Sequence, residues 1–223
     1  MPRPAPPADR PDRKQAILLA AERLFAEHGY HGVSLRQIAD GAGVPLALVG
    51  YYYGQKHELF QAIFDHWGDT IEERVAGLRV ALQAPERQRL QRVVAAFVEP
   101  VLRMRASPEG EYYALLVARE LYHAREDTDH VLRTWFDPLA HAFIDALHEL
   151  LPHASRGRAA WCYQFMLGAL LHHMSDNRIE RLSRGEVRGR DDAARQLLID
   201  FIVGGLRAAL PRPTASRTPR RHA

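Results

Sequence analysis

The alternation of apolar and polar positions follows a helical period through most of the chain. From residue 59 to residue 82, apolar side chains recur every three or four positions, which predicts one helix of about seven turns that ends before Pro85. No segment has the two-residue period of a strand, so the sequence predicts an all-α fold. The same reading predicts further helices or apolar helical stripes over about residues 13–28, 90–102, 112–122, 129–151, 158–176 and 191–210.

Residues 34–56 are expected to form two short helices with a tight turn between them. Ser34 is an N-cap residue, and Gln37 three positions later completes a capping box that starts the first helix. The glycines of Gly41-Ala42-Gly43 end that helix, because glycine enters the left-handed region at low cost. Pro45 stands where a second helix of about two turns begins. This spacing is typical of a helix-turn-helix, whose second helix lies in the DNA major groove.

This block resembles the amino-terminal DNA-binding domain of TetR-family transcriptional regulators. Over about residues 10–65, three helices and their turns agree in register with the family pattern. The resemblance implies a three-helix helix-turn-helix head and a C-terminal helical-bundle domain for ligand binding and dimerisation. Departures from the pattern, which affect the operator that is read, fall at Pro45, Leu46, Leu48 and Gly50. The matching residues are Ile17, Ala20-Ala21, Leu24-Phe25, Gly29-Tyr30, Ser34, Ile38-Ala39, Ala42-Gly43-Val44, Tyr51-Tyr52-Tyr53, Lys56 and Leu59.

Four parts of the chain are expected on this basis. Residues 1–11 form a disordered arm, because they are rich in proline and poor in apolar side chains. Residues 12–57 form the helix-turn-helix DNA-binding domain, and residues 58–210 form the helical ligand-binding and dimerisation domain. Residues 211–223 form a basic flexible tail. The arginines of the arm and tail could touch DNA, but a solvated terminus is the simpler interpretation of both.

Composition and charge narrow the class of protein. A chain of 223 residues that is 47% hydrophobic can bury a core in one or two domains. The net charge is only +3, so nucleic-acid binding has to come from basic residues placed on one face. The single cysteine, Cys162, excludes an internal disulfide and fits a reducing compartment. There is no run of 18 apolar residues and no signal-peptide pattern, so we expect a cytoplasmic protein without a membrane partner.

The candidate DNA contacts lie in the helix-turn-helix from Ser34 to Tyr53 and at the start of the next helix. A tyrosine hydroxyl can reach a phosphate, and its ring can touch a thymine methyl group. Tyr53 occupies the position of a family phenylalanine and is expected in the core. The predicted contacts to a double-stranded operator are Ser34, Arg36, Gln37, Pro45, Leu46, Ala47, Tyr51, Tyr52 and Lys56.

No pattern in the sequence indicates catalysis or metal binding. Adjacent residues on a helix point about 100° apart, so His172 and His173 cannot easily share one ion. The chain has no HExxH and no Cys-x-x-Cys spacing. No residue near Cys162 in the sequence would lower its pKa, as a nucleophile requires. We therefore expect no enzyme, no catalytic residues, no metal and no cofactor.

An effector pocket is expected in the C-terminal domain. Arg119 falls in an otherwise apolar helix, and a buried guanidinium needs a paired anion. The anion is either a carboxylate of the protein or the acidic end of a ligand, and both alternatives remain open. The predicted lining of the pocket is Trp67, Phe97, Met104, Tyr112, Arg119 and Phe136.

Two C-terminal helices are expected to form the dimer interface. Each has a stripe in which small residues alternate with large apolar ones, so that two backbones can approach while the large side chains fill grooves. In a twofold interface each stripe pairs with its own copy. The alternative is that both stripes close the core of the monomer. The predicted interface residues are Trp161, Phe165, Gly168, Ala169, His172, Leu197, Phe201, Gly204, Gly205 and Ala208.

Together these features predict a DNA-binding transcriptional regulator. The simplest form is a ligand-responsive repressor that binds a pseudo-palindromic operator as a homodimer and is released by a small, largely apolar effector. Two alternatives from other classes are an all-α enzyme and a ligand-independent DNA-architectural protein. An enzyme would need a convergent acid, base or metal set, and none is visible at a recognisable spacing.

Overall fold

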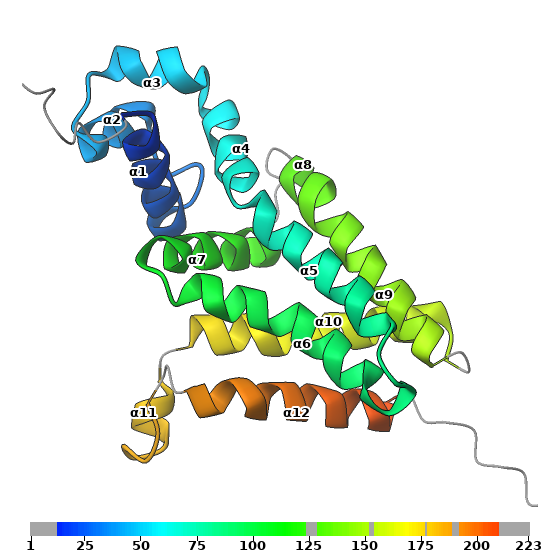
Figure 1. Cartoon of the computed structure of the whole chain (residues 1–223). Coiled ribbons are helices and arrows are strands. Elements are labelled where there is room, and N and C mark those ends of the chain that lie inside the picture. The colour runs from blue at the N-terminus through cyan, green and yellow to red at the C-terminus, as the bar shows by residue number, and fades with distance from the viewer. Residues whose placement is uncertain (1–12, 124–128, 152–153, 177, 189–191, 210–223) are drawn as a thin grey trace, which may run out of the picture. The chain divides into compact units, whose positions relative to one another are not determined.

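All regular structure in the described part of the chain is helical, as predicted (Figure 1). No helix there is long and apolar enough to cross a membrane. The predicted arm (1–11) and tail (211–223) lie outside the described residues. The structure is a computed structural model that describes residues 13–123, 129–151, 154–176, 178–188 and 192–209.

The helices form two compact units. The first unit holds residues up to Thr70 and residues 103–135, and the second holds residues 71–102 and those from Phe136 onward. These compact units are not the functional domains predicted above, so the boundary between residues 57 and 58 stays a prediction. The first unit contains α1 (Arg13–His28), α2 (Leu35–Ala42), α3 (Leu46–Tyr53), α4 (Lys56–His66), α7 (Pro108–His123) and α8 (Asp129–Val131). The second contains most of α5 (Gly68–Leu82) and α6 (Glu86–Arg105), with α9 (Asp137–Leu150), α10 (Arg156–Ser175), α11 (Ile179–Leu182) and α12 (Asp192–Ala209).

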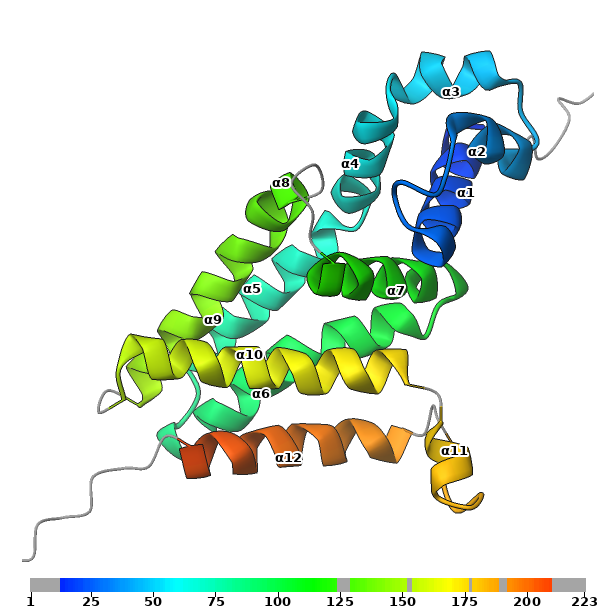
Figure 2. The same cartoon turned by 180° about the vertical axis from the view of Figure 1, so that it is seen from behind.

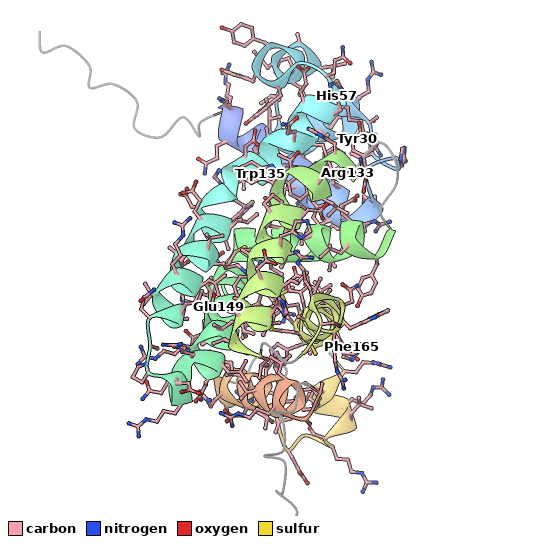
Figure 3. The ribbon with its side chains drawn as sticks, turned by 90° about the vertical axis from the view of Figure 1, so that its right-hand side faces the viewer. Tyr30, His57, Arg133, Trp135, Glu149 and Phe165 are labelled. Atoms are coloured by element: carbon pink, nitrogen blue, oxygen red, sulfur yellow. The ribbon has the colours of Figure 1, made fainter. Side chains whose placement is uncertain are left out.

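The predicted seven-turn helix over residues 59–82 is wrong, because the chain breaks at Trp67 and Gly68 into α4 and α5. Local sequence does not require this break, since neither residue is a proline and the apolar period continues through it. Tertiary contacts hold the broken geometry. The ring of Trp135 packs over Gly68 so closely that a Cβ added there would lie 3.3 Å from two of its carbon atoms (Figure 3).

The first unit is built on α1, which contacts α2, α3, α4 and α7. The apolar face of α1 carries Ile17 and Phe25, which are both fully buried. The ring of Phe25 lies edge-on to Phe60 of α4, with centroids 5.4 Å apart, and Tyr30 contacts the same Phe60 ring at 4.9 Å. This aromatic cluster fixes α4 against α1, so the start of α4 has a set position beside the helix-turn-helix.

The second unit has its core between α6, α9 and α10. Phe97 of α6 is fully buried and packs edge-on against Phe143 of α9 and Tyr163 of α10. Pro100 lies inside α6, as the sequence indicates. The helix predicted over residues 129–151 is interrupted by a π-helical turn, Leu132–Phe136, two residues before Pro138.

Helices α10 and α12 lie side by side and antiparallel, with α11 at the end where α10 stops and α12 begins (Figure 2). Both helices agree with their predicted ranges to within two residues. The short helix α11 is not among the helices that the sequence predicts.

Candidate nucleic-acid interface and its supporting contacts

The turn between α2 and α3 is fixed by local hydrogen bonds, as the sequence predicts. The Gln37 N–H donates to Ser34 Oγ at 3.3 Å, and the Ser34 N–H donates to Gln37 Oε1 at 2.8 Å, which completes the capping box. Gly43 ends α2 with φ +65°, in the left-handed region. The Val44 N–H then donates to the Ala39 carbonyl at 3.0 Å. These contacts set the direction in which α3 leaves the turn.

Helix α3 has one buried residue and a largely open outer face. Val49 is fully buried and anchors the helix. Tyr51 is the most exposed of the large hydrophobic side chains among the described residues, at 79%. Nothing lies within 4 Å of the position that a Cβ would take at Gly50, so another molecule can approach the backbone there. The exposed residues on this face are Pro45, Leu46, Ala47, Gly50 and Tyr51.

The three consecutive tyrosines of α3 have different environments. Tyr53 is half-buried and does not belong to the buried core in which it was expected, and its hydroxyl donates to the Lys14 carbonyl of α1 at 2.9 Å. Tyr52 is half-buried, and its ring lies edge-on to Tyr51 with centroids 5.1 Å apart. Tyr52 therefore limits the directions that the exposed Tyr51 ring can take. One tyrosine holds α3 on α1, and two face outward or partly outward.

Lys56 at the start of α4 is placed by aromatic rings. Its Nζ lies 4.4 Å from the ring centroid of Tyr30 and 5.9 Å from that of Phe25, in cation–π geometry. The side chain is half-buried, so part of it remains open to solvent. At the same helix start, the Gln55 N–H donates to Glu58 Oε2 at 2.7 Å, which satisfies one of the N–H groups that could bind a phosphate. His57 beside it is exposed (Figure 3).

The remaining predicted DNA contacts lie on α2. Arg36 is exposed, with its charge available on the surface. Ser34 and Gln37 are also exposed, but their polar atoms bond to each other in the capping box. These two residues therefore shape the turn. Arg13 and Lys14, at the start of α1, add two more exposed basic residues to the first unit.

The predicted effector-binding residues are divided between the two units. Trp67, Met104, Tyr112 and Arg119 belong to the first unit, and Phe97 and Phe136 to the second. Arg119 lies at the C-terminal end of α1, where its Nε and Nη2 are each 2.8 Å from the position of a Cβ at Gly29. A cation at this end of a helix is favourable, because the last carbonyl groups carry partial negative charge. The structure thus places Arg119 beside the C-terminal end of α1, whereas the sequence left open a carboxylate of the protein or the acidic end of a ligand.

Sequence reasoning missed a buried polar contact between Glu22 and Trp67. Glu22 of α1 is only 1% exposed, and Trp67 Nε1 donates to its Oε2 at 2.7 Å. The Trp67 ring also stacks on Tyr113 of α7, with centroids 5.1 Å apart. Three segments therefore meet at the residue where α4 ends. A signal was present, because Glu22 lies three and four residues from Phe25 and Leu18 on the apolar face of α1, where a carboxylate needs a buried partner.

The predicted interface helices leave large apolar side chains in solvent. Trp161 and Phe165 of α10, and Leu197 and Phe201 of α12, are each between 65% and 71% exposed. The glycines among them, Gly168, Gly204 and Gly205, have nothing within 4 Å of a Cβ position. The opposite face of α12 carries the buried residues Ile199, Ile202, Val203 and Leu206. The large residues of the predicted stripe thus lie outside the core of the described protomer.

Neither Cys162 nor His172 belongs to a cluster of potential metal ligands among the described residues. Cys162 is buried, and burial raises the pKa of its thiol because the thiolate is penalised away from water. His172 lies 3.5 Å from an oxygen of Asp176, one helical turn away. Within the described ranges, no three His, Cys, Asp or Glu side chains come together as a metal site would require.

Two family models match this chain, one over the helix-turn-helix and one over the C-terminal helices. The first, described as bacterial regulatory proteins of the tetR family, matches residues 17–63. The second, described as the tetracyclin repressor-like C-terminal domain, matches residues 95–205. Together they span more than two thirds of the chain. The chain belongs to the TetR family. Members of this family are transcriptional regulators and not enzymes, in agreement with the prediction from sequence.

Curated relatives of the chain include both transcriptional activators and transcriptional repressors. The chain is 35% identical to the transcriptional activator FasR of Mycolicibacterium smegmatis over 92 residues, 40% of this chain and 41% of that protein. It is 28% identical to the transcriptional repressor AcnR of Corynebacterium glutamicum over 158 residues, 62% of this chain and 84% of that protein. The matches to the first relatives, FasR and the AcnR of Corynebacterium efficiens, span less than half of the length of those proteins.

Solved structures of other regulators have the same fold. PfmR, a TetR-family transcriptional regulator of Thermus thermophilus, matches with a TM-score of 0.58 at 18% identity, over 84% of this chain and 93% of that chain. FadR, a fatty acid degradation regulator of Bacillus halodurans, matches with a TM-score of 0.57 at 17% identity, over 89% and 98%. At this level of identity the matches establish the fold and not the ligand.

Proposed function

We propose that this TetR-family protein is a dimeric, DNA-binding transcriptional regulator. The observation that carries the proposal is the outer face of α3, where Leu46 and Tyr51 are exposed beside the small residues Ala47 and Gly50. Small residues let the helix approach base edges closely, and Tyr51 offers both a ring and a hydroxyl. In this proposal Arg36 contacts the phosphate backbone or a base edge, and Tyr52 and Lys56 contact the backbone.

The dimer would use the exposed faces of α10 and α12. Four large apolar side chains in solvent are costly in a monomer, and a second copy of the same face would cover them. The open glycines let the partner backbone come close. Such a dimer would place its two α3 helices in successive major grooves, about 34 Å apart. It would therefore bind a pseudo-palindromic sequence.

The regulator would respond to a small, largely apolar effector, and repression is the sign that we propose. The relatives AcnR of Corynebacterium glutamicum and NicS of Pseudomonas putida are named as repressors. An effector releases the operator if it binds more tightly to the dimer in which the two helix-turn-helix domains are wrongly spaced for the operator. Couplings of this kind are typically about 1–3 kcal/mol, or roughly 5–150-fold in affinity. This protein would act in the cytoplasm, where it meets DNA.

Selection of DNA fragments from the genome of the source organism tests the proposal. We expect wild-type protein to enrich fragments that share an inverted repeat with half-sites about one helical turn apart. The double variant Tyr51→Ala/Tyr52→Ala should bind the enriched fragments at least about tenfold more weakly, because it loses both outward-facing rings. Tyr122→Ala is the matched control, since Tyr122 is an exposed tyrosine on α7, away from the helix-turn-helix.

Two results would contradict the proposal. One is the absence of any enriched sequence at low salt, where phosphate contacts are strongest. The other is equal affinity of the double variant and the Tyr122→Ala control. If fragments are enriched as expected, the protein bound to them can be used to screen fatty acids and aromatic acids for release of the protein from DNA. Release by one of them separates a ligand-responsive regulator from an architectural DNA-binding protein.

A further inference from the structure

The segment between α10 and α12 exposes apolar side chains although it has a defined shape. This segment, residues 178–188, contains α11 and the turn that follows it. None of the four residues of α11 is buried. Leu182 is 60% exposed, and Ile179 and Val187 are also exposed. Three exposed aliphatic side chains within nine residues form a patch, whereas single exposed apolar residues are ordinary on a protein surface.

Local hydrogen bonds hold this segment in place. The Arg178 N–H and guanidinium donate to the carboxylate of Asp176, with the shortest contact, from Nη2, at 2.6 Å. The Gly185 N–H donates to the Glu180 carbonyl at 2.8 Å. Ser183 Oγ donates to that same carbonyl at 3.0 Å and accepts from the Val187 N–H at 3.2 Å. The shape of the segment therefore does not depend on burial of its own apolar side chains.

The turn after α11 includes a backbone conformation that is unfavourable for its residue. Arg184 has φ +58° and is followed by Gly185 at φ +86°. The left-handed region costs a non-glycine residue about 1–2 kcal/mol, and arginine has no short polar group to offset this. The hydrogen bonds of Ser183 and Gly185 hold this turn within the protomer. Ile179 and Leu182 stay exposed there, and a contact outside the protomer would bury them.

The segment is continuous with the exposed face of α10 and α12. The segment joins the C-terminal end of α10 to the start of α12. In Figure 3 it lies on the same side of α12 as Phe165 of α10. Phe165 belongs to the face proposed above as the twofold interface. If a twofold axis passes through this face, a projection beside the face is placed to contact the other subunit.

We propose that residues 178–188 form a dimerisation arm that packs on the partner subunit through Ile179, Leu182 and Val187. This inference rests on the proposed dimer through α10 and α12 and adds a second contact to it. The occupant of the apolar patch is a second copy of this chain. The arm contributes to the affinity of the dimer, while the main contact remains between the paired helices.

The test is a measurement of the dimer dissociation constant by sedimentation equilibrium of the full chain. The double variant Ile179→Asp/Leu182→Asp should raise this constant about tenfold to a hundredfold, because two apolar contacts are lost at the arm. Val80→Asp is the matched control, since Val80 on α5 is similarly exposed and lies outside the proposed interface. It should leave the constant unchanged. Circular dichroism checks that all variants stay helical.

A third variant separates failure of the arm from failure of the dimer interface. Gly168→Arg should give monomers if the α10 and α12 face is correct. If Gly168→Arg is monomeric and the arm variant dimerises as tightly as wild type, the arm is overturned and the interface stands. If Gly168→Arg and Gly205→Arg both remain dimeric and helical, the interface and the arm that rests on it are both overturned. Weaker DNA binding by the arm variant at an unchanged dimer constant would assign the arm to DNA and overturn the proposal.

Hydrogen exchange gives a second measurement that does not depend on the arm variant. Amide groups of residues 178–188 should exchange more slowly in the wild-type dimer than in the Gly168→Arg monomer, because the partner covers them only in the dimer. Equal exchange of this segment in both proteins would overturn the arm contact.

Discussion

Two regions of the molecule leave large side chains exposed, and they differ in what surrounds those side chains. On α3 the exposed Tyr51 carries a hydroxyl, and exposed arginine and lysine residues lie on the neighbouring helices of the first unit. On α10 and α12 the exposed residues Trp161, Phe165, Leu197 and Phe201 are followed along each helix by glycines with open space around them. The first composition suits a negatively charged, hydrogen-bonding partner, and the second suits an apolar surface that excludes water.

The two regions also differ in how they are supported. Helix α3 is short, buries one residue and relies on Tyr53 and its capped turn for its position. Helices α10 and α12 are long and have a full buried face behind the exposed one. A change on the outer face of α3 should therefore affect DNA affinity alone. A change on the outer face of α10 should affect the dimer first, and DNA affinity through it.

The largest effect is expected from a charge at the centre of the α10 and α12 face. Gly168→Arg should convert the dimer to monomers and lower operator affinity by several orders of magnitude at low protein concentration, because a single head has no partner. The substitution has room in the protomer, and arginine favours a helix more than glycine does, so the monomer should stay folded. Sedimentation velocity measures the outcome. A dimeric Gly168→Arg that remains helical, together with a dimeric Gly205→Arg, would place the interface elsewhere.

A smaller effect is expected where the first unit is held together. Glu22→Ala leaves the Trp67 indole N–H without its carboxylate acceptor in a buried site. We expect the free energy of unfolding, measured in urea, to fall by about 1–3 kcal/mol. Glu27→Ala on the same helix is the control, because Glu27 is exposed, and its change should stay within about 0.5 kcal/mol. Equal changes in the two variants would remove the structural role of the Glu22–Trp67 contact.

Lys56 tests whether one residue serves both support and DNA binding. Lys56→Met keeps the aliphatic stem and removes the charge over Tyr30, which should lower the free energy of unfolding by about 0.5–1 kcal/mol. If the ammonium also meets a phosphate, the slope of log affinity against log salt should become shallower by about one. Tyr30→Leu is the matched variant, with lower stability and an unchanged slope. An unchanged slope in Lys56→Met would leave Lys56 with a structural role only.

The smallest expected effect concerns Cys162, which is next to Trp161 in sequence but on the buried face of α10. Because burial raises the pKa of this thiol, the thiolate is scarcer at pH 8 in the folded protein than in the unfolded chain. Thiol reagents should therefore react much more slowly with native protein than with protein in urea, and the native rate should rise with pH. Similar rates in both states would mean that the inner face of α10 is open.

Local chemistry made much of the head predictable. The capping box of Ser34 and Gln37 and the left-handed Gly43 each act within a few residues of their own position, and both occur as predicted. The break at Trp67 was not predictable in the same way, because Glu22, Tyr113 and Trp135 come from distant parts of the chain. The same reason applies to Lys56, whose aromatic partners lie 26 or more residues earlier.

The C-terminal site shows the same division. The stripe through Phe165 and Phe201 is visible in the sequence because it has the helical period. Both residues are exposed in the protomer, and their place in a dimer interface stays a prediction. Helix α11 has only four residues and none of them is buried, so it shows no helical period of apolar residues in the sequence. Arg119 was placed by its apolar neighbours in sequence, whereas the structure sets it against Gly29, 90 positions earlier in the chain.

The central claim is that α3 reads DNA and that α10 and α12 join two copies of the chain. The most direct measurement is operator binding by Tyr51→Ala and Phe165→Asp over a wide range of protein concentration, with the dimer constant of each variant. Tyr51→Ala should stay dimeric and bind at least about tenfold more weakly at every concentration above the dimer constant. Phe165→Asp should lose binding together with the dimer and regain it when high concentration restores the dimer. The account is contradicted if Tyr51→Ala binds as wild type does, or if Phe165→Asp binds as a dimer at the lowest concentrations.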